Sequence, residues 1–368
     1  MNALVIGGTG PTGPFIVNGL LARGFRVEIL HTGNHEVPEI PPEVGHTHVS
    51  PHDPAAFAAA IGDRKWDLCI VTYGRLRTVA SVMAGRVGRF ISIGGGPGYR
   101  GYMNPWLHDP EGLPRPLGED APMVDDPAQD EKGWRVVCSE EAVFRCHPQA
   151  THFRYPFVYG PYQPAPREWP IVRRVLDGRR HIILPDGGLT LDAYGYAENL
   201  AHAVLLAVDQ PARASGEIFN AADSHALSLL DVVVHAARAL DWEFEIVGMP
   251  FELAAPARPL LGRPSATHRL YDLTKLRSQL GYSDVVAPAE AVARTARWLA
   301  AHPPPPVNGY SVESVLQDPF DYAAEDLLIE RWKRAVAGLE MPVWSVPPGW
   351  GLAYSGPGGR PRSRATFE

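Results

Sequence analysis

The stretch ALVIGGTGPTG, residues 3–13, decides the fold of this chain. An apolar run from Ala3 to Ile6 is followed by glycines and then by a helical pattern from about Pro11 to Arg23. Gly24 ends this pattern, and a second apolar run extends from Arg26 to Leu30. A strand, a helix and a second strand in this order predict a βαβ unit with parallel strands.

Three glycines, Gly7, Gly10 and Gly13, lie where the first strand meets the first helix. A tight turn, a close approach of the backbone to a pyrophosphate and close packing of helix on strand each require a missing side chain. The amides at the start of the helix can bind the phosphate oxygens. The spacing therefore predicts a dinucleotide-binding unit, and the alternative is a glycine turn without a ligand.

Strand and helix patterns alternate through the first 160 residues. Further strands are expected at residues 46–49, 67–72, 89–93 and 151–155, with helices between several of them. This alternation predicts an α/β fold, a doubly wound parallel sheet of the Rossmann-like type with helices on both faces. We expect a dinucleotide-binding domain at 1–160, to which some later elements return, a smaller substrate-binding region at 161–302, and a Pro/Gly/aromatic-rich C-terminal extension at 303–368.

Composition excludes several classes of protein. The formal net charge of −7 over 368 residues, without a long run of like charge, argues against a nucleic-acid partner. The three cysteines form no Cys-x-x-Cys pair, and no secretion or membrane-span pattern is present, so we expect a cytoplasmic protein with no membrane partner. No metal site is expected from the sequence, and His46 and His48 are interpreted as surface or packing residues.

Three later segments strengthen the dinucleotide interpretation: RYPFVYGP (residues 154–161), GEIFN (216–220) and YDLTK through LGY (271–282). Together with the glycine pattern, they resemble the extended branch of the short-chain dehydrogenase/reductase superfamily, the NAD-dependent epimerase/dehydratase group. The resemblance covers about residues 1–300 and implies a nicotinamide cofactor and a small-molecule substrate. The cofactor-binding residues that it implies, or that lie at the matching positions, are Gly7, Thr9, Gly10, Thr12, Gly13, His31, Thr32, Tyr155, Pro156 and Val158.

The end of the second strand bears on the choice between NAD and NADP. In the family this place carries an acid that binds a ribose hydroxyl, or an arginine that accepts a 2′-phosphate. This chain has His31-Thr32-Gly33-Asn34 there. Because an acid would repel a phosphate and none is present, the sequence favours NADP(H) over NAD(H).

The catalytic groups of the family are missing where the resemblance would place them. Its Tyr-x-x-x-Lys pair, which transfers a proton at the substrate oxygen, would fall near Gly133 and Val137, and its serine at Gly94-Gly95-Gly96. Proton transfer would then need water or another side chain. The candidate catalytic residues are Tyr99, Lys132 and Arg135, with Tyr102 and His108 as further candidates, and an ordinary structural role is the alternative for each.

Three functions stay open. The first is an atypical NAD(P)-dependent oxidoreductase that transfers a hydride between the cofactor and the carbonyl or carbinol carbon of a small organic substrate. The others are a nucleotide-sugar epimerase/dehydratase and a non-catalytic dinucleotide-binding protein. The resemblance also implies a homodimer through the helix around Ala142 and the preceding helix. A local basic patch consists of Arg173, Arg174, Arg179 and Arg180. Two interpretations of this patch are open: it binds an anionic substrate, or it is a solvated helix face.

Overall fold

The computed structural model describes residues 1–72, 74–307 and 309–348. The chain forms two compact units, Met1–Phe320 and Asp321–Glu368. In the second unit, helix α13 (Tyr322–Ala337) begins after Asp321, whose side chain accepts a hydrogen bond from the amide of Ala324. The expected division at residues 160 and 302 stays a prediction, and residues 349–368 of the expected extension lie outside the described residues.

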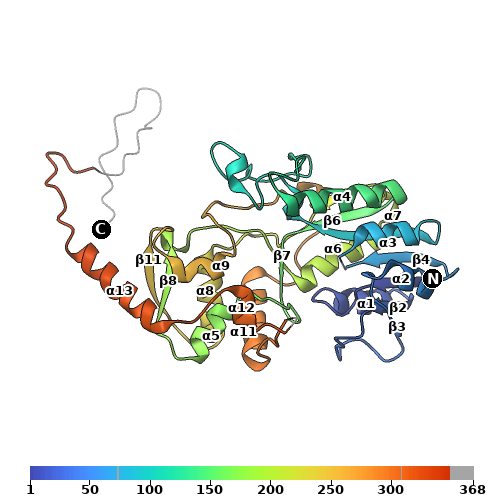
Figure 1. Cartoon of the computed structure of the whole chain (residues 1–368), viewed down its shortest axis with the longest axis horizontal. Coiled ribbons are helices and arrows are strands. Elements are labelled where there is room, and N and C mark those ends of the chain that lie inside the picture. The colour runs from blue at the N-terminus through green and yellow to red at the C-terminus, as the bar shows by residue number, and fades with distance from the viewer. Residues whose placement is uncertain (73, 308, 349–368) are drawn as a thin grey trace, which may run out of the picture. The chain divides into compact units, whose positions relative to one another are not determined.

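A seven-stranded parallel sheet in the order β10-β6-β5-β4-β1-β2-β3 forms the centre of the first unit (Figure 1). From β1 the chain first adds β2 and β3 on one side of the sheet and then β4, β5 and β6 on the other side. A ligand is expected in the crevice at this switch point, at the carboxyl ends of β1 and β4. The α/β sheet expected from the sequence is thereby confirmed. Its strands are β1 (Asn2–Ile6), β2 (Arg26–His31), β3 (Gly45–His48), β4 (Trp66–Val71), β5 (Val87–Gly95), β6 (Thr151–Tyr155) and β10 (Ile218–Asn220).

Helices cover both faces of this sheet, because successive side chains of a strand point to opposite sides. Ala3 and Val5 pack into a core with helices α1 (Gly13–Ala22), α6 (Ala197–Asp209) and α10 (Thr274–Leu280). Leu4 and Ile6 pack into a second core on the other face. The helices of that core are α2 (Pro54–Ile61), α3 (Leu76–Met83) and α4 (Glu131–Cys146).

Beyond the sheet, shorter elements form a region that lies at one side of the Rossmann part in Figure 1. It contains two small parallel pairs, β7 (Phe157–Tyr159) with β9 (Tyr194–Tyr196) and β8 (His181–Pro185) with β11 (Glu245–Met249). Its helices are α5 (Trp169–Leu176), α8 (Leu229–Arg238), α9 (Arg258–Leu261), α11 (Pro288–Ala301) and α12 (Val312–Leu316), and α7 (Pro211–Ala214) follows α6 in the chain.

The basic patch expected around α5 is not a uniformly solvated face. Arg174 is buried, and its Nη1 atom lies 2.7 Å from a carboxylate oxygen of the equally buried Asp318. Arg173 is paired with Asp177 at 2.8 Å. Arg174 therefore holds the segment around Asp318 against α5, and its charge is already compensated within the fold.

The long segment from Gly94 to Asp130 is folded although it contains only two short 3-10 turns, η1 (Gly96–Gly98) and η2 (Pro105–Leu107). It has a small core of its own, and single β-bridges join Tyr99 to Met123 and Leu117 to Tyr271. The members of that core are Tyr99, Tyr102, Leu113 and Leu117.

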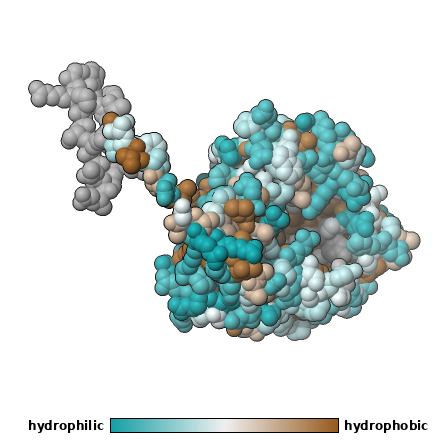
Figure 2. Space-filling view, turned by 60° about the vertical axis from the view of Figure 1, so that its left-hand side comes forward, coloured by the Kyte–Doolittle hydropathy of each residue, from teal (hydrophilic) through white to brown (hydrophobic). Residues whose placement is uncertain are grey.

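Hydrophilic residues predominate on the face shown in Figure 2, with hydrophobic residues scattered among them. Within the described residues, the structure has no helix with the length and apolar character needed to cross a membrane.

Candidate functional site

The glycine turn lies at the carboxyl end of β1, and the three glycines of the predicted motif, Gly7, Gly10 and Gly13, differ in why they are needed. Gly7 has φ +109°, and a Cβ there would lie 2.2 Å from Oγ1 of Thr72. A Cβ on Gly13 would lie 2.0 Å from the carbonyl oxygen of Gly8. Gly10 has an ordinary φ, and no heavy atom of the described chain lies within 4 Å of its Cβ position. Conformation and packing therefore explain Gly7 and Gly13 but leave Gly10 unexplained.

The amino end of α1 is suited to an anion. Thr12 occupies the N-cap position, but its side chain makes no capping hydrogen bond to the amides of the first turn in the described structure. Uncapped amides at a helix start carry a partial positive charge and can bind a phosphate. Thr9 and Thr12 are both buried in this turn.

The predicted cofactor residues after β6 are at the same edge of the sheet, since the parallel strands β1 and β6 both end there. Tyr155 is buried, and its hydroxyl donates to the carbonyl oxygen of Leu200 at 3.1 Å. Pro156 is buried, and Val158 on β7 is half-buried. Val158 therefore has the most accessible side chain of the three.

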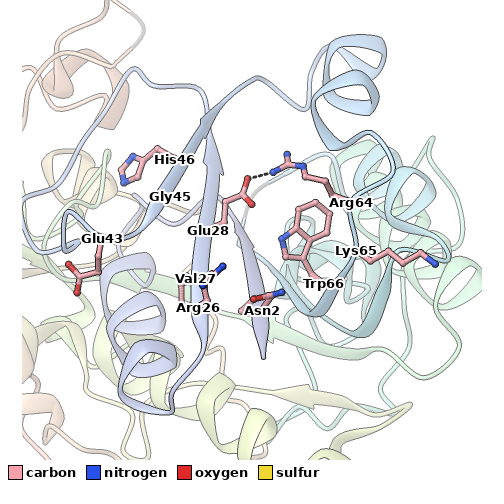
Figure 3. Close-up of a pocket in the computed structure, with 11 residues that line it drawn as sticks. Asn2, Arg26, Val27, Glu28, Glu43, Gly45, His46, Arg64, Lys65 and Trp66 are labelled. Atoms are coloured by element: carbon pink, nitrogen blue, oxygen red, sulfur yellow. Dashed lines mark hydrogen bonds and ion pairs between the residues drawn. The ribbon is translucent and has the colours of Figure 1, made fainter.

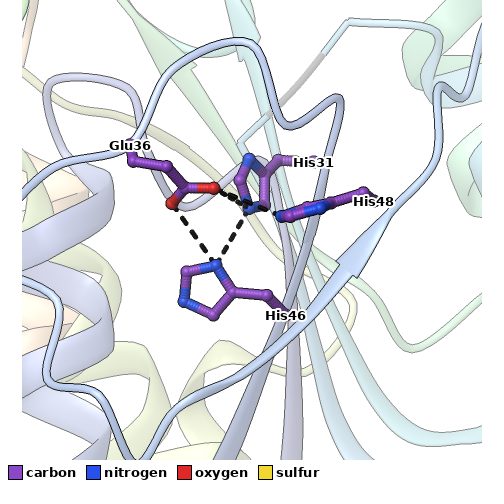
Figure 4. A group of neighbouring side chains, drawn as sticks. All are labelled: His31, Glu36, His46 and His48. Carbon is purple, nitrogen blue, oxygen red and sulfur yellow. Dashed lines mark hydrogen bonds and ion pairs between the residues drawn. The ribbon is translucent and has the colours of Figure 1, made fainter.

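Three histidines and a glutamate come together at the end of β2, which the sequence did not reveal (Figure 4). His31 is buried and faces His46 and His48 on the neighbouring strand β3. Glu36 of the following loop lies among the three rings, 3.4 Å from Nε2 of His31 and 3.2 Å from Nε2 of His48. Thr32 is exposed. The premise that no acid lies at this place is therefore wrong, because Glu36 supplies one from five residues further along the chain.

Tyr99, the first catalytic candidate, is part of a buried hydrogen-bond network. Its hydroxyl donates to Oδ1 of Asn220 at 2.7 Å and accepts from Nη1 of Arg154 at 2.8 Å. Burial raises the pKa of Tyr99 to about 12, although the charge of Arg154 opposes this effect. Tyr99 thus connects β6 and β10 through their side chains.

Lys132 and Arg135, the other two catalytic candidates, are exposed on α4. They line a pocket of about 450 Å³ together with Gly94 and Gly95 at the carboxyl end of β5. Tyr99 is not among the residues that line this pocket. The structure therefore brings Lys132 and Arg135 together at the expected edge of the sheet but places Tyr99 elsewhere.

The two further candidates of the loop are engaged in local contacts. Tyr102 is buried, with the guanidinium of Arg269 above its ring at 4.2 Å. Nε2 of His108 lies 3.0 Å from the carbonyl oxygen of Arg100. The first contact joins the loop to the segment around Arg269, and the second joins two positions within the loop.

Two positions at which the sequence resemblance would place catalytic side chains leave little room for a Cβ atom. A Cβ on Gly133 would lie 2.6 Å from the carbonyl oxygen of Pro97. A Cβ on Gly96 would lie 2.0 Å from the hydroxyl oxygen of Tyr271. Tyr271 thus occupies the space beside Gly96, next to the carboxyl end of β5.

Tyr271 is a functional candidate that the sequence analysis missed. It belongs to the only Tyr-x-x-x-Lys string of the chain, Tyr271 to Lys275, but α10 begins at Thr274, so the two residues do not share a helical turn. Nζ of Lys275 is paired with Glu217 at 2.7 Å. The Tyr271 hydroxyl lies 3.4 Å from the carbonyl oxygen of Tyr155, and burial holds its pKa well above the usual value.

A pair of arginines, Arg263 buried and Arg167 half-buried, lies in the region beyond the sheet. Arg167 and Arg263 are 3.6 Å and 3.4 Å from the same carboxylate oxygen of Asp192. Nη1 of Arg167 and both Nε and Nη1 of Arg263 are buried without a hydrogen-bond partner in the described part of the chain. Two guanidinium groups thus share one carboxylate, which leaves buried positive charge and unused N–H donors that an anion could satisfy.

A pocket of about 530 Å³ lies at the opposite edge of the sheet (Figure 3). Its wall includes Trp66 and an ion pair of 2.7 Å between Glu28 and Arg64. The pocket is at the amino ends of β1, β2 and β4. Ligands of doubly wound folds bind at the carboxyl ends, so this pocket is not the candidate site.

Comparisons with known protein sequences give short matches. No family model matches the chain. The uncharacterized protein YbjS of Escherichia coli (strain K12) is 29% identical over 140 residues, which cover 33% of this chain and 42% of YbjS. The chain thus matches less than half the length of its curated relatives.

Comparison of structures gives longer matches. A UDP-glucose 4-epimerase from Thermotoga maritima, solved with UDP-glucose, aligns with a TM-score of 0.64 and 18% identity over 82% of this chain and 99% of that chain. A UDP-glucuronic acid 4-epimerase from Bacillus cereus, solved with NAD, aligns with a TM-score of 0.63 and 14% identity over the same fractions. At these identities the likeness establishes the fold. The fold expected from the sequence, a Rossmann-like α/β fold with a smaller C-terminal region, is confirmed.

Proposed function

We propose that this protein is an NAD(P)-dependent enzyme of the short-chain dehydrogenase/reductase type, which transfers a hydride between the cofactor and the carbonyl or carbinol carbon of a small organic substrate. The observation that carries the proposal is Gly10. Its backbone conformation suits any residue and its Cβ direction is open, so the fold does not require a glycine there. A diphosphate against the turn would occupy this space, which explains the missing side chain.

The amides of the glycine turn and of the start of α1 would hold the diphosphate. The nicotinamide cofactor would supply the hydride chemistry, and the carboxyl ends of β5 and β6 would position the reacting carbon. Val158 is the half-buried side chain at this edge that is available to contact the cofactor.

Both NAD(H) and NADP(H) remain candidates for the cofactor. The expectation of NADP(H) rested on the absence of an acid at the end of β2, but Glu36 lies there and would repel a 2′-phosphate. His31 faces the same place, and burial lowers the pKa of His31, which disfavours its charged form. Glu36 and His31 therefore favour NAD(H).

The second candidate function is a nucleotide-sugar epimerase or dehydratase. The pair Arg167 and Arg263 favours a substrate with an anionic group such as a diphosphate, because its unused donors would otherwise stay unsatisfied. The structural neighbours solved with UDP-glucose or NAD are consistent with this substrate class. The lack of room for a Cβ atom at Gly133 argues for a proton route different from that of the family.

Tyr271 is the hydroxyl that we propose for this proton route. Its high pKa keeps the phenol protonated at neutral pH, so it can donate a hydrogen bond or a proton to a substrate oxygen. Lys132 and Arg135 are the alternatives at the same edge of the sheet. A homodimer through α3 and α4 is a further part of the proposal that solution mass measurement would test.

The experiment that tests the proposal is titration of the full chain with NADH and NADPH, followed by cofactor fluorescence. Gly10→Val should abolish binding while the circular dichroism spectrum stays that of the wild type. Gly338→Ala, at a glycine of the second unit with ordinary φ, serves as the control and should bind like the wild type. Turnover of a panel of carbonyl compounds would then support the enzyme, whereas binding without turnover would favour a non-catalytic dinucleotide-binding protein. Unchanged affinity in Gly10→Val would refute the proposed site.

A further inference from the structure

Three imidazoles and one carboxylate converge at the end of β2 and β3 (Figure 4). From this geometry we propose that His31, Glu36, His46 and His48 bind one divalent transition-metal ion of the Zn²⁺ type. The ligand atoms of the four side chains all lie within 4.8 Å of one another. The site does not include the glycine turn, but it lies at the end of β2, beside the place where the ribose of the proposed cofactor would lie.

The spacing of these atoms fits a tetrahedral ion. Zn²⁺ bonds of about 2.0–2.2 Å to nitrogen and oxygen place neighbouring ligand atoms about 3.4 Å apart. Nε2 of His31 lies 3.2 Å from Nδ1 of His46 and 3.4 Å from a carboxylate oxygen of Glu36. Glu36 is in turn 3.4 Å from Nδ1 of His46 and 3.2 Å from Nε2 of His48. Small movements of these four side chains would be enough to place their ligand atoms around one metal ion.

The three imidazole rings belong to residues of the strands β2 and β3 and not to a loop. His46 and His48 are two residues apart on β3, so their side chains point to the same face of the sheet. The register of the sheet pairs His48 with His31 on β2. Only Glu36 comes from the loop after β2, so an ion here would connect this loop to the sheet.

The chemistry of the donors selects the class of ligand. Imidazole nitrogens suit Zn²⁺, Cu²⁺ and Ni²⁺, whereas Mg²⁺ and Ca²⁺ prefer oxygen ligands. A metal binds the neutral imidazole. An anion is a poor occupant because the Glu36 carboxylate lies in the middle of the group.

One hydrogen bond must change when the ion binds. The amide of Gly33 donates to Nδ1 of His31 at 3.3 Å, which places the proton of a neutral ring on Nε2. Coordination through Nε2 moves this proton to Nδ1, so the Gly33 amide has to turn away. The exchange of a long hydrogen bond for a metal bond favours the loaded state.

The experiment uses the full chain without a histidine tag, stripped with a chelator and titrated with Zn²⁺ in a calorimeter. The wild type should bind one ion per chain, and its melting temperature should rise with Zn²⁺. His48→Ala and Glu36→Gln alter exposed side chains and should each weaken the affinity at least about tenfold. His35→Ala removes a histidine of the same loop outside the group and should bind like the wild type.

Co²⁺ gives a second measurement that does not depend on stability. Tetrahedral Co²⁺ bound to the wild type should give intense visible absorption bands, and these should be lost in His48→Ala. The proposal is overturned if the wild type takes up neither ion, or if His48→Ala and Glu36→Gln bind Zn²⁺ as tightly as the wild type.

Discussion

The guanidinium of Arg154 makes two parallel hydrogen bonds to the carboxylate of Glu140, from Nε to Oε2 at 2.9 Å and from Nη2 to Oε1 at 2.7 Å. Both residues are buried, and the pair joins β6 to α4. Nε2 of His152 lies 3.2 Å from the same carboxylate. Such a bidentate pair is strong when complete, but it leaves a buried charge unpaired when one partner is lost.

Glu140→Gln should therefore destabilise the protein by about 3–5 kcal/mol, because Arg154 would keep its charge in a buried place without a counter-ion. Unfolding in urea, followed by circular dichroism, measures this change. Glu141→Gln, at the exposed neighbouring position, is the matched control and should change the stability by less than about 0.5 kcal/mol. Equal stabilities of the two variants would contradict the role assigned to the pair.

The same carboxylate predicts a pH dependence. Burial alone would raise the pKa of Glu140, but hydrogen bonds from Arg154 and His152 outweigh it and lower the pKa from 4.5 to about 2. A carboxyl whose pKa is lower in the folded state stabilises the fold above its unfolded pKa. This contribution, on the order of 3 kcal/mol, is lost as the pH falls from about 4.5 toward 2. The urea midpoint of the wild type should fall over this range more steeply than that of Glu140→Gln, and parallel profiles would refute the assignment.

The glycine turn predicts a contrast between two substitutions. Gly13→Ala places a methyl group 2.0 Å from the carbonyl oxygen of Gly8, so the turn and α1 must shift and the melting temperature should fall. Gly10→Ala meets open space and should leave the melting temperature of the ligand-free protein unchanged. Differential scanning calorimetry without cofactor measures both. A melting temperature of Gly10→Ala as low as that of Gly13→Ala would show that the fold itself requires Gly10.

The sheet and the glycine turn could be predicted from the sequence because both depend on residues that are neighbours along the chain. The apolar runs at Asn2–Ile6 and Arg26–His31 and the glycines between α1 and β1 are local patterns. The place of Tyr99 after β5 makes it a candidate catalytic residue in the sequence. The direction of its side chain, however, is set by a hydrogen bond to Asn220, which is distant in sequence.

The parts of the site that the sequence did not reveal come together only through the tertiary fold. Arg167 and Arg263 share Asp192 although they belong to distant segments. His31 meets His48 through the register of β2 and β3, and Glu36 reaches them from a loop. The two His-x-x-x-His spacings of the chain, His31 to His35 and His48 to His52, each contain only one member of this group. The alternation of His46 and His48 on a strand could have suggested two ligands on one face.

The pair Arg167 and Arg263 predicts binding of a diphosphate. Arg263→Met keeps the volume of the side chain but removes the N–H donors that lack partners. The wild type should gain thermal stability on addition of uridine diphosphate, and Arg263→Met should lose most of this gain. Arg258→Met, at an exposed position, should retain it. An equal gain in all three proteins would place the anion elsewhere.

Removal of the Tyr271 hydroxyl should slow the chemical step but leave cofactor binding unchanged. Its phenol stays protonated at neutral pH because burial raises its pKa, and its 3.4 Å contact with the Tyr155 carbonyl is too long to contribute much to stability. Tyr271→Phe should therefore keep the fold and the affinity for the cofactor, while kcat on the best carbonyl substrate falls by about 10²–10⁴-fold.

Absorbance of the reduced cofactor follows this loss, and Tyr310→Phe, at an exposed tyrosine, controls for removal of a hydroxyl elsewhere. If Tyr271→Phe turns over like the wild type, the proton comes from Lys132 or from water, and Arg135, which keeps its proton, would donate only a hydrogen bond. Lys132→Met then distinguishes the lysine from water, because it removes the only ammonium group that lines the pocket at the end of β5 among the described residues.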